Sequence, residues 1–253
     1  MIAQFSYERR LVDDYPNLRC MVAFIGGISI DADFDDIVRA NLDQARGMLT
    51  QYESESRIPS IQQWRQAYRR NGTDPTKFRM AAESILRRLR TSDAFTSELH
   101  PFVVLCNSLS AMHALPVAAL DADCIDGNLK VGYASGHTHY LGFDGETIVV
   151  PKGEITFEDD AGQAHARRWS HRQSAFSSIS ERTQRALVIA EALHDSAELD
   201  LGRLLDNLTD AVASRWPSGT VSGRLLSQQD LVAGCRSPFL ARLVSYPDME
   251  VMK

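Results

Sequence analysis

The chain has 253 residues, 44% of them hydrophobic, which suits one large folded domain and excludes a disordered protein. Its formal net charge of −6 argues against a general nucleic-acid coat, because neutralising phosphates needs positive charge. No apolar run approaches the roughly 20 residues of a membrane span. The first residues lack a signal-peptide pattern, because the chain is charged from Glu8 onward. We therefore expect a cytoplasmic protein with no membrane partner.

Arginine and cysteine usage narrows the choice further. Only four of the 27 basic residues are lysines, and the arginines gather near positions 65–70, 87–90 and 167–172. The planar fork of arginine suits phosphate or carboxylate, although solvated helix faces explain such clusters equally well. The four cysteines form no CxxC pair, so we predict buried free thiols rather than disulfides or a zinc site.

In chain order, the first half predicts one strand and then helices. Residues 19–30 are a short apolar run ended by Gly26–Gly27, which predicts a buried strand. Apolar residues at helical spacing predict helices over about 33–53, from Pro59 to Asn71, over 78–89 and over 101–112. The third of these helices carries Arg87, Arg88 and Arg90 on its other side.

The segment from 116 to 169 changes character. Short strand-like runs alternate with the turn signals Asp126–Gly127, Asp144–Gly145, Lys152–Gly153 and Asp160–Ala161–Gly162. Glycine accepts a positive φ at little cost, so these pairs favour tight turns. The stretches 141–150 and 155–169 each predict a strand, a turn and a strand.

Helices are predicted again after this segment. Ser178 with Glu181 three residues later resembles a capping box, which predicts a helix to about Asp195. Another helix is predicted from about Leu199 to Trp216. Beyond residue 217 no periodic pattern stands out. We therefore predict an α+β domain over 1–216, with a strand-helix region (1–75) packed on it, and a tail (217–253) without assigned structure.

Motifs of common catalytic and metal sites give little. No Walker loop, no GxGxxG after a strand and no GxSxG elbow is present. His137 and His139 form a possible metal pair, and Asp121 and Asp123 place two carboxylates on one strand face. Solvated histidines and aspartates that cap turns or form local ion pairs are the commoner explanation. We predict no metal and no cofactor.

The segment 166–174 is the densest in functional side chains, with three arginines, Trp169, His171 and Gln173 within eight residues. Guanidinium groups and an indole suit an anionic partner that stacks, such as an RNA terminus. In the alternative explanation, Trp169 anchors the core and the arginines pair with nearby carboxylates.

Two sets of residues resemble a known family. The segment 100–127 resembles the B3 portion of the phenylalanyl-tRNA synthetase β subunit, at Val103, Asn107, Pro116, Ala119, Asp121, Asp123 and Gly127. Proteins that consist of B3/B4 domains alone are similar over 61–89, at the Gly153–Glu154 and Asp159–Asp160 turns, and over 167–188. The resemblance runs from about Asp14 to Asp195. It implies a B3/B4-like α+β fold, with a layered mixed sheet flanked by helices.

The resemblance also implies a function. In the synthetase, this module hydrolyses mischarged tRNA and removes tyrosine from the phenylalanine tRNA. The chain lacks the other synthetase regions, so we expect an aminoacyl-tRNA deacylase that acts in trans on the aminoacylated 3′ end of tRNA and does not charge tRNA. A synthetase is a second candidate partner. On this hypothesis Asn107 is catalytic, the substrate contacts are Ala118, Arg168, Trp169, His171, Arg172 and Gln173, and the RNA contacts are Arg65, Arg69, Arg87 and Arg88.

The chain departs from the synthetase where tyrosine is read. Ala118 stands in place of a histidine, and the region 171–173 replaces a Gly-Gly-Glu segment whose glutamate reads the tyrosine hydroxyl. A site without that partner loses strong discrimination, so tyrosine is not the expected substrate. Two alternatives stay open: a non-catalytic module that binds tRNA or an amino-acid-like ligand, and a fold recruited outside translation.

Overall fold

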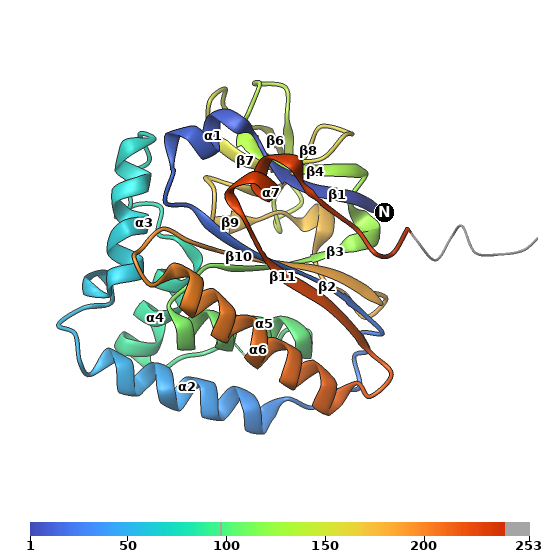
Figure 1. The fold of residues 1–253 in the computed structure, drawn as a ribbon. Coiled ribbons are helices and arrows are strands. Elements are labelled where there is room, and N and C mark those ends of the chain that lie inside the picture. The colour runs from blue at the N-terminus through green and yellow to red at the C-terminus, as the bar shows by residue number, and fades with distance from the viewer. Residues whose placement is uncertain (97, 241–253) are drawn as a thin grey trace, which may run out of the picture.

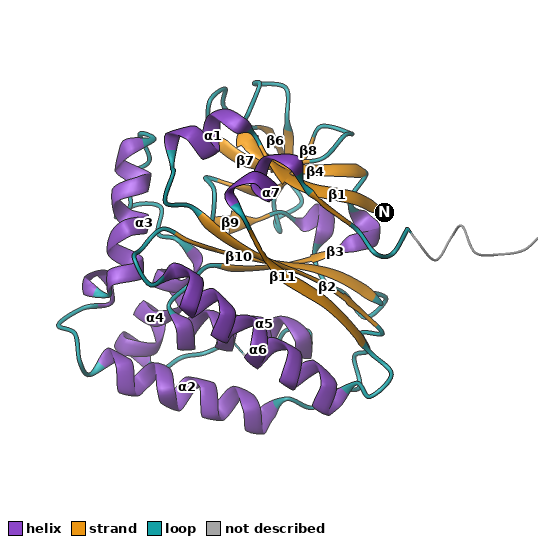
Figure 2. Cartoon of the chain, viewed as in Figure 1, coloured by secondary structure: helices purple, strands orange, loops and turns teal. Residues whose placement is uncertain are grey.

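The chain forms two stacked β-sheets and a layer of helices that covers the outer face of the smaller sheet (Figures 1 and 2). The structure is a computed structural model and describes residues 1–96 and 98–240. The expected α+β class, with layered mixed sheets and flanking helices, is confirmed. Among the described residues, no helix is both long and apolar enough to cross a membrane.

The smaller sheet has four antiparallel strands. Their order is β11 (Thr220–Leu226), β2 (Arg19–Gly26), β10 (Arg185–Ala192) and β3 (Val117–Asp121). The two central strands are buried on both faces, which explains why their sequences are continuous apolar runs without alternation. β2 is the strand predicted over 19–30, and it ends at Gly26.

The helical layer holds α2 (Asp35–Leu49), α3 (Pro59–Arg70), α4 (Ala81–Ser92), α5 (Pro101–His113) and α6 (Ala197–Arg215). α5 contacts β3, and α6 contacts β2, β10 and β11. The five predicted helices that correspond to these elements are confirmed, although α4 begins at Ala81 rather than at Phe78. Met80 is extended, with φ −66° and ψ 158°, so the helix cannot include the residues before it.

The larger sheet is mixed. Its order is β12 (Cys235–Arg236), β1 (Ile2–Tyr7), β4 (Gly127–Tyr133), β7 (Ile155–Glu158), β8 (Gln163–Arg167), β5 (His139–Leu141) and β6 (Thr147–Val149), with β9 (Arg172–Gln173) paired to β8. The β1–β4 and β5–β8 pairs are parallel. The hairpins predicted over 141–150 and 155–169 are confirmed. The short helices α1 (Arg9–Asp14) and α7 (Gln228–Ala233) lie against β4 and β1.

The helix predicted from Ser178 to Asp195 is wrong. This segment contains β10, and the Ser178 hydroxyl donates to the Ala175 carbonyl instead of capping a helix. The apolar run of β10 is buried on both faces of a central strand, so its periodicity cannot separate strand from helix. The capping-box pattern is therefore not followed by a helix.

The turn signal at Asp126–Gly127 does not mark a hairpin. β3 ends at Asp121 in the four-stranded sheet, whereas β4 begins at Gly127 in the larger sheet. The turn therefore carries the chain from one sheet to the other. The signal is local and identifies a turn, but it cannot say which strands the turn joins.

The segment after residue 217 contributes to both sheets. β11 pairs with β2, and β12 pairs with β1, so residues on both sides of the expected boundary at 216 share one sheet. The division into a domain over 1–216 and a tail stays a prediction. Residues 241–253 of that tail lie outside the described residues.

Candidate active site

A small cavity of about 160 Å³ lies between the two sheets and beside α5. Its lining brings together six of the seven residues proposed for ester chemistry and substrate contact, namely Asn107, Ala118, Trp169, His171, Arg172 and Gln173. Arg168 does not line it. The remaining wall includes Pro116, Phe157, Ile189 and Glu191. Segments from Ala81 to Glu191 therefore meet at one site.

The turn between β8 and β9 shapes this site. Arg168 and Trp169 have φ of 45° and 58°, a left-handed conformation that costs a side-chain-bearing residue roughly 1–2 kcal/mol. Glu154 holds the turn in place. Its carboxylate accepts two hydrogen bonds of 2.9 Å from the Arg167 guanidinium and one of 3.0 Å from the Arg168 backbone N–H.

Helices α3 and α4 hold the same turn from the other side. The Tyr68 and Ser170 hydroxyls lie 3.0 Å apart, and the Ala81 N–H donates to the Ser170 carbonyl at 2.9 Å. Because both sheets and two helices fix the turn, its strained backbone is maintained by the surrounding fold.

Trp169 and Arg168 are held mainly by contacts within the protein, and their predicted substrate contacts stay predictions. Trp169 is fully buried and packs edge-on against Tyr15 and Trp64, so its indole cannot stack on an RNA base. The Arg168 guanidinium lies 3.8 Å from the centre of the Phe78 ring and 3.7 Å from the Glu154 carboxylate. The alternative, in which Trp169 anchors the core and these arginines pair with a carboxylate, holds for both residues.

His171 is a neutral imidazole with a defined tautomer. Its Nδ1 lies 2.6 Å from the Arg79 carbonyl oxygen. A carbonyl only accepts hydrogen bonds, so Nδ1 carries the proton and Nε2 keeps a lone pair. Burial lowers the pKa of His171, and the nearby arginines lower it further. The Nε2 atom can therefore accept a proton or a hydrogen bond at neutral pH.

Three polar side chains at the cavity differ in how they are held. Gln173 Nε2 donates to the Ala119 carbonyl at 2.9 Å, which fixes the orientation of its amide. The exposed guanidinium of Arg172 forms no ion pair with any residue in 1–96 or 98–240, unlike Arg167. Across the same described residues the Asn107 side chain has no hydrogen-bond partner. Arg172 and Asn107 are thus available to a ligand.

Glu191 is a site residue that the sequence did not reveal. It is only 2% exposed, and its Oε1 accepts hydrogen bonds from the Tyr7 hydroxyl at 2.8 Å and from Trp169 Nε1 at 2.9 Å. Burial raises the pKa of Glu191 to about 7, against the lowering effect of these two hydrogen bonds. The available signal was a single acidic residue within an apolar run, but that run was assigned to a helix.

A buried chain of Ser177, His165 and Asp159 resembles a catalytic triad. His165 Nδ1 lies 2.8 Å from the Ser177 hydroxyl, and Nε2 lies 3.0 Å from the Asp159 carboxylate. All three side chains are buried, and Asp159 also accepts backbone N–H groups of the β7–β8 turn. None of the three lines the cavity, so their role is to hold the turn.

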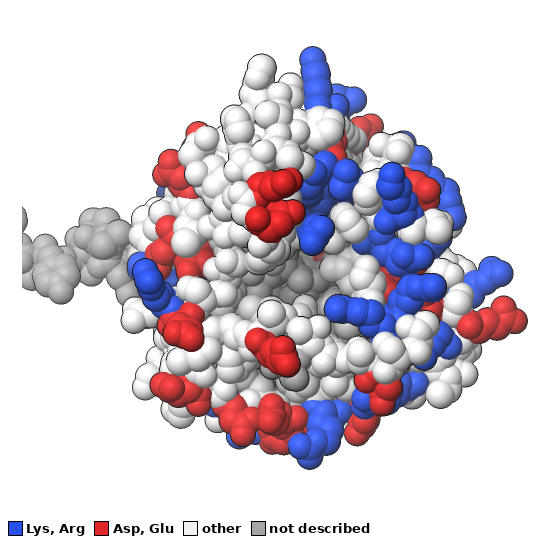
Figure 3. All heavy atoms as spheres, turned by 180° about the vertical axis from the view of Figure 1, so that it is seen from behind, with Lys and Arg blue, Asp and Glu red and all other residues white. Residues whose placement is uncertain are grey.

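The arginines predicted to contact RNA fall into two groups. Arg65 donates to the buried carboxylate of Glu83, and Arg87 pairs with Glu55 at 3.2 Å, so both serve the fold. Arg69 and Arg88 are exposed and form no ion pair within the described residues, whereas Arg87 is paired but its side chain is still 51% exposed. Figure 3 shows Lys and Arg side chains gathered on the side of the molecule where α3 and α4 lie, next to a hollow in that face.

The two residue pairs considered as metal ligands are either exposed or bound to other protein groups. His137 and His139 are exposed, and only His139 belongs to a strand. Asp121 accepts hydrogen bonds from the Asp123 N–H and the Thr183 hydroxyl, and Asp123 pairs with Arg185 at 2.7 Å. No group of three or more His, Cys, Asp or Glu side chains suited to a metal occurs in the described part of the chain.

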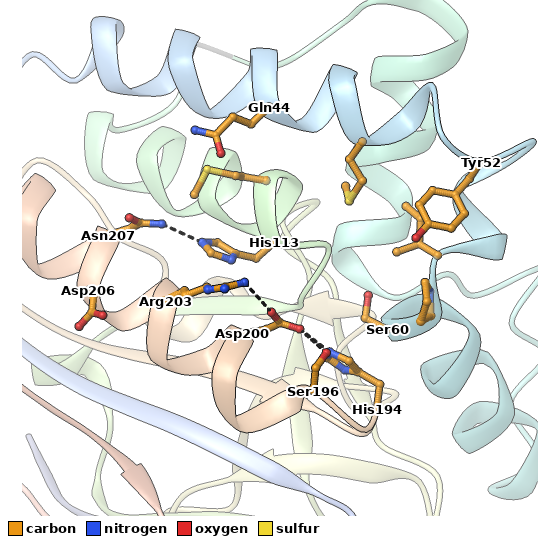
Figure 4. Close-up of a pocket in the computed structure, with 14 residues that line it drawn as sticks. Gln44, Tyr52, Ser60, His113, His194, Ser196, Asp200, Arg203, Asp206 and Asn207 are labelled. Carbon is orange, nitrogen blue, oxygen red and sulfur yellow. Dashed lines mark hydrogen bonds and ion pairs between the residues drawn. The ribbon is translucent and has the colours of Figure 1, made fainter.

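A larger cavity, about 610 Å³, lies in the helical layer among α2, α5, α6 and the start of α3 (Figure 4). Its polar groups bind one another. Asp200 accepts hydrogen bonds from Ser196 at 2.7 Å and from His194 at 2.9 Å, and His113 lies 3.0 Å from the Asn207 amide. Since these groups are already partnered, the smaller cavity is the better candidate for chemistry.

Two stacked sheets, a helical layer and a polar-rimmed cavity between the sheets define an α+β protein with an internal ligand site. Residues 63–213 match the model of the B3/4 domain, and because this is more than half of the 253 residues, the chain belongs to the B3/4 domain family.

A similar solved structure is an N-terminal fragment of the phenylalanyl-tRNA synthetase beta subunit from Pyrococcus horikoshii, with 8% identity and a TM-score of 0.48. The match covers 87% of this chain and 50% of that chain, so this chain spans about half the length of that fragment. No curated protein matches the chain.

Proposed function

We propose that this protein hydrolyses the ester of a mischarged aminoacyl-tRNA and does not charge tRNA itself. The observation that carries the proposal is the meeting of Asn107, His171 and Arg172 at one cavity within the region that matches the B3/4 domain. Site residues suggested by resemblance to the synthetase module come from separate helix and strand segments, and the fold brings them together.

The side chains at the cavity suit ester hydrolysis. A water molecule attacks the ester carbonyl carbon, and its proton passes to the free Nε2 of His171. Negative charge develops on the carbonyl oxygen, where the Asn107 amide and the Arg172 guanidinium donate hydrogen bonds. The bond to the ribose oxygen then breaks, that oxygen takes the proton from His171 Nε2, and the products are a free amino acid and uncharged tRNA.

The RNA would approach over the side formed by α3 and α4. The exposed Arg69 and Arg88 are the members of the predicted set that form no ion pair within the described residues, so they are the first candidates for phosphate contact. A net charge of −6 does not oppose local phosphate binding when the arginines lie on one side.

The test is deacylation of a panel of tRNAs, each charged with one of the twenty amino acids, measured as loss of the ester. We expect turnover of at least one mischarged tRNA, and a loss of roughly 100-fold in Asn107→Ala, His171→Ala and Arg172→Ala. Arg39→Ala is the matched control, because this exposed arginine lies on α2 and is distant from the cavity in the sequence and in the layers. A panel with no deacylation at all would refute the proposal.

A non-catalytic module that binds tRNA or an amino-acid-like ligand is the second candidate. It is favoured by the pairing of Arg65 and Arg87 with carboxylates, which leaves a smaller basic surface than the sequence predicted. Salt-dependent tRNA binding without turnover would support the tRNA-binding form. Binding of a free amino acid without tRNA affinity would support the other.

A further inference from the structure

Glu191 lies on the floor of the small cavity. Side chains two residues apart on a strand share one face, and both Ile189 and Glu191 of β10 line the cavity. That face is turned toward the larger sheet, because the partners of Glu191 are Tyr7 of β1 and Trp169 after β8. Glu191 is the acidic member of a lining that is otherwise apolar at this depth, with Ile189 and Phe157 beside it.

The two oxygens of Glu191 are used unequally. Oε1 accepts hydrogen bonds from both Tyr7 and Trp169, whereas Oε2 accepts none from residues 1–96 and 98–240. Oε2 is accessible and not fully enclosed, and an ionised carboxylate can accept about four hydrogen bonds. The cavity is where a partner for Oε2 can be supplied.

We infer that Glu191 is the specificity-determining residue of this site, and that its Oε2 accepts a hydrogen bond from a donor group on the bound amino acid, either the α-ammonium or a side-chain hydroxyl. The identity of the ligand as an aminoacyl group rests on the proposed function. The recognition itself rests on the buried carboxyl and its unfilled acceptor.

The size and polarity of the cavity set the class of ligand. A cavity of about 150 Å³ is known to hold benzene, so 160 Å³ admits a group of about that size. An apolar group would cover Oε2 and leave it without a partner, whereas a hydroxyl or ammonium would bond to it. Sites that hydrogen-bond a substrate hydroxyl reject the analogue without it by on the order of 10⁴-fold. If the donor is a side-chain hydroxyl, apolar amino acids should therefore be poor ligands.

The experiment measures binding of stable 3′-aminoacylamino-3′-deoxyadenosines by calorimetry at pH 7.5, where most of the Glu191 carboxyl, with its pKa of about 7, is ionised and Oε2 accepts hydrogen bonds. The probes are the threonine and valine amides, which are nearly isosteric, together with their N-acetyl forms. If a hydroxyl is the donor, the threonine amide should bind at least about 100-fold more tightly than the valine amide. If the ammonium is the donor, the two amides should bind alike and N-acetylation should weaken both by a similar factor. No binding of any amide, or no effect of either change, overturns the inference.

Two variants test whether the preference for ligands with a hydrogen-bond donor depends on Glu191. Glu191→Gln keeps the oxygen that Tyr7 and Trp169 need and replaces Oε2 with an N–H donor, so the preference for donor-bearing ligands should vanish while the fold persists. Glu191→Leu should also abolish it and tests the same point if the glutamine variant misfolds. Glu146→Gln, in the exposed β5–β6 turn, is the matched control and should bind as the parent does. Preference retained in both Glu191 variants overturns the inference.

This outcome is separable from that of the proposed function. The amides contain no ester, so their binding does not depend on hydrolysis. Selective binding that requires Glu191, combined with no deacylation of any tRNA, would remove the hydrolytic function and leave the inference. Deacylation whose rate and amino-acid preference do not change in the Glu191 variants would leave the hydrolytic function and remove the inference.

Discussion

At the scale of single residues, the protonation of the Glu191 carboxyl changes near neutral pH. Its pKa of about 7 lies above the ordinary value of 4.5, chiefly because of burial. The titratable groups around it are Tyr7, Cys20 and Tyr68, and burial raises the pKa of each, so they stay neutral across this range. Burial and the nearby arginines lower the pKa of His171 across the cavity, which favours its neutral form near pH 7. Glu191 is thus the group of this cluster that changes charge near neutral pH.

We predict that this titration destabilises the fold as pH rises. Below about pH 4.5 both the folded and the unfolded chain hold the proton, and from there to about pH 7 only the folded chain does. The free energy of unfolding should therefore fall by roughly 3 kcal/mol over that interval and then level off. Urea unfolding of the parent and of Glu191→Gln across pH 4–8 gives the difference between their free energies of unfolding, which isolates the contribution of Glu191. A difference that is flat with pH would contradict it.

The arginines of α3 and α4 give a second prediction for single residues. Arg65→Ala should destabilise the fold by roughly 3 kcal/mol, because it leaves the buried Glu83 carboxylate without its main partner. Arg69→Ala should change stability by less than about 0.5 kcal/mol, because Arg69 is exposed. Thermal unfolding of the two variants compares them directly. Equal melting temperatures would show that the Glu83 pair contributes little.

Between elements, the β8–β9 turn places the catalytic candidates. Two left-handed residues, the Glu154 carboxylate and contacts from α3 and α4 all act on this one turn. The strain at Arg168 and Trp169 persists because the neighbouring elements determine the backbone path. The position of His171 at the cavity therefore depends on groups that do not touch a ligand.

We predict that Glu154→Gln weakens both the site and the fold. The amide cannot form the paired, charge-assisted contacts with Arg167, so the turn should loosen and His171 should lose its fixed position. Deacylation should drop by about 10-fold or more, and the free energy of unfolding by roughly 2–3 kcal/mol. Glu146→Gln is the control for loss of a surface carboxylate. Unchanged turnover together with lowered stability would show that the turn is held by its other contacts.

The exposed arginines on α3 and α4 lead to a prediction about how tRNA binding depends on salt. Removal of one arginine that binds a phosphate should reduce the slope of log affinity against log salt by about 1. Arg69→Ala and Arg88→Ala should each do so and weaken binding to all tRNAs alike, whereas Arg39→Ala on α2 should not. Filter binding at several salt concentrations measures the slopes. Equal slopes in all variants would show that the tRNA phosphates do not contact Arg69 or Arg88, and would contradict an RNA-binding surface on these helices.

For the whole molecule, both sheets depend on strands from the two ends of the chain. β11 forms one edge of the four-stranded sheet beside β2, and β12 pairs with β1 in the larger sheet. Without β11, the backbone groups of β2 would be left as a long apolar edge, which is prone to aggregation.

We accordingly predict that a chain ending at Trp216 does not fold stably. A chain ending at Leu240, which keeps β11 and β12, is the reference. Size-exclusion chromatography and thermal unfolding should show aggregation or a non-cooperative transition for the shorter chain. A monomer that melts cooperatively within a few degrees of the reference would refute the prediction and support a domain that ends at residue 216.

Local patterns determined much of this protein from the sequence alone. Helical spacing predicts α2, α3, α5 and α6, and glycine turns predict two hairpins. The segment 166–174 points to His171, Arg172 and Gln173, and the resemblance points to Asn107; the fold brings these four residues to one cavity. These signals are local because backbone conformation and amphipathic spacing are encoded within a few residues. The resemblance added the family, which the comparison with the B3/4 domain confirmed.

The tertiary structure decided what depends on distant contacts. It made 185–192 a central strand, because burial on both faces erases the periodicity that separates strand from helix. It buried Trp169 in the core, paired Arg65 and Arg87 with carboxylates, and placed Glu191 on the cavity floor. Each of these outcomes depends on which side chains from remote segments meet, and hence on the packing of the two sheets rather than on neighbouring sequence.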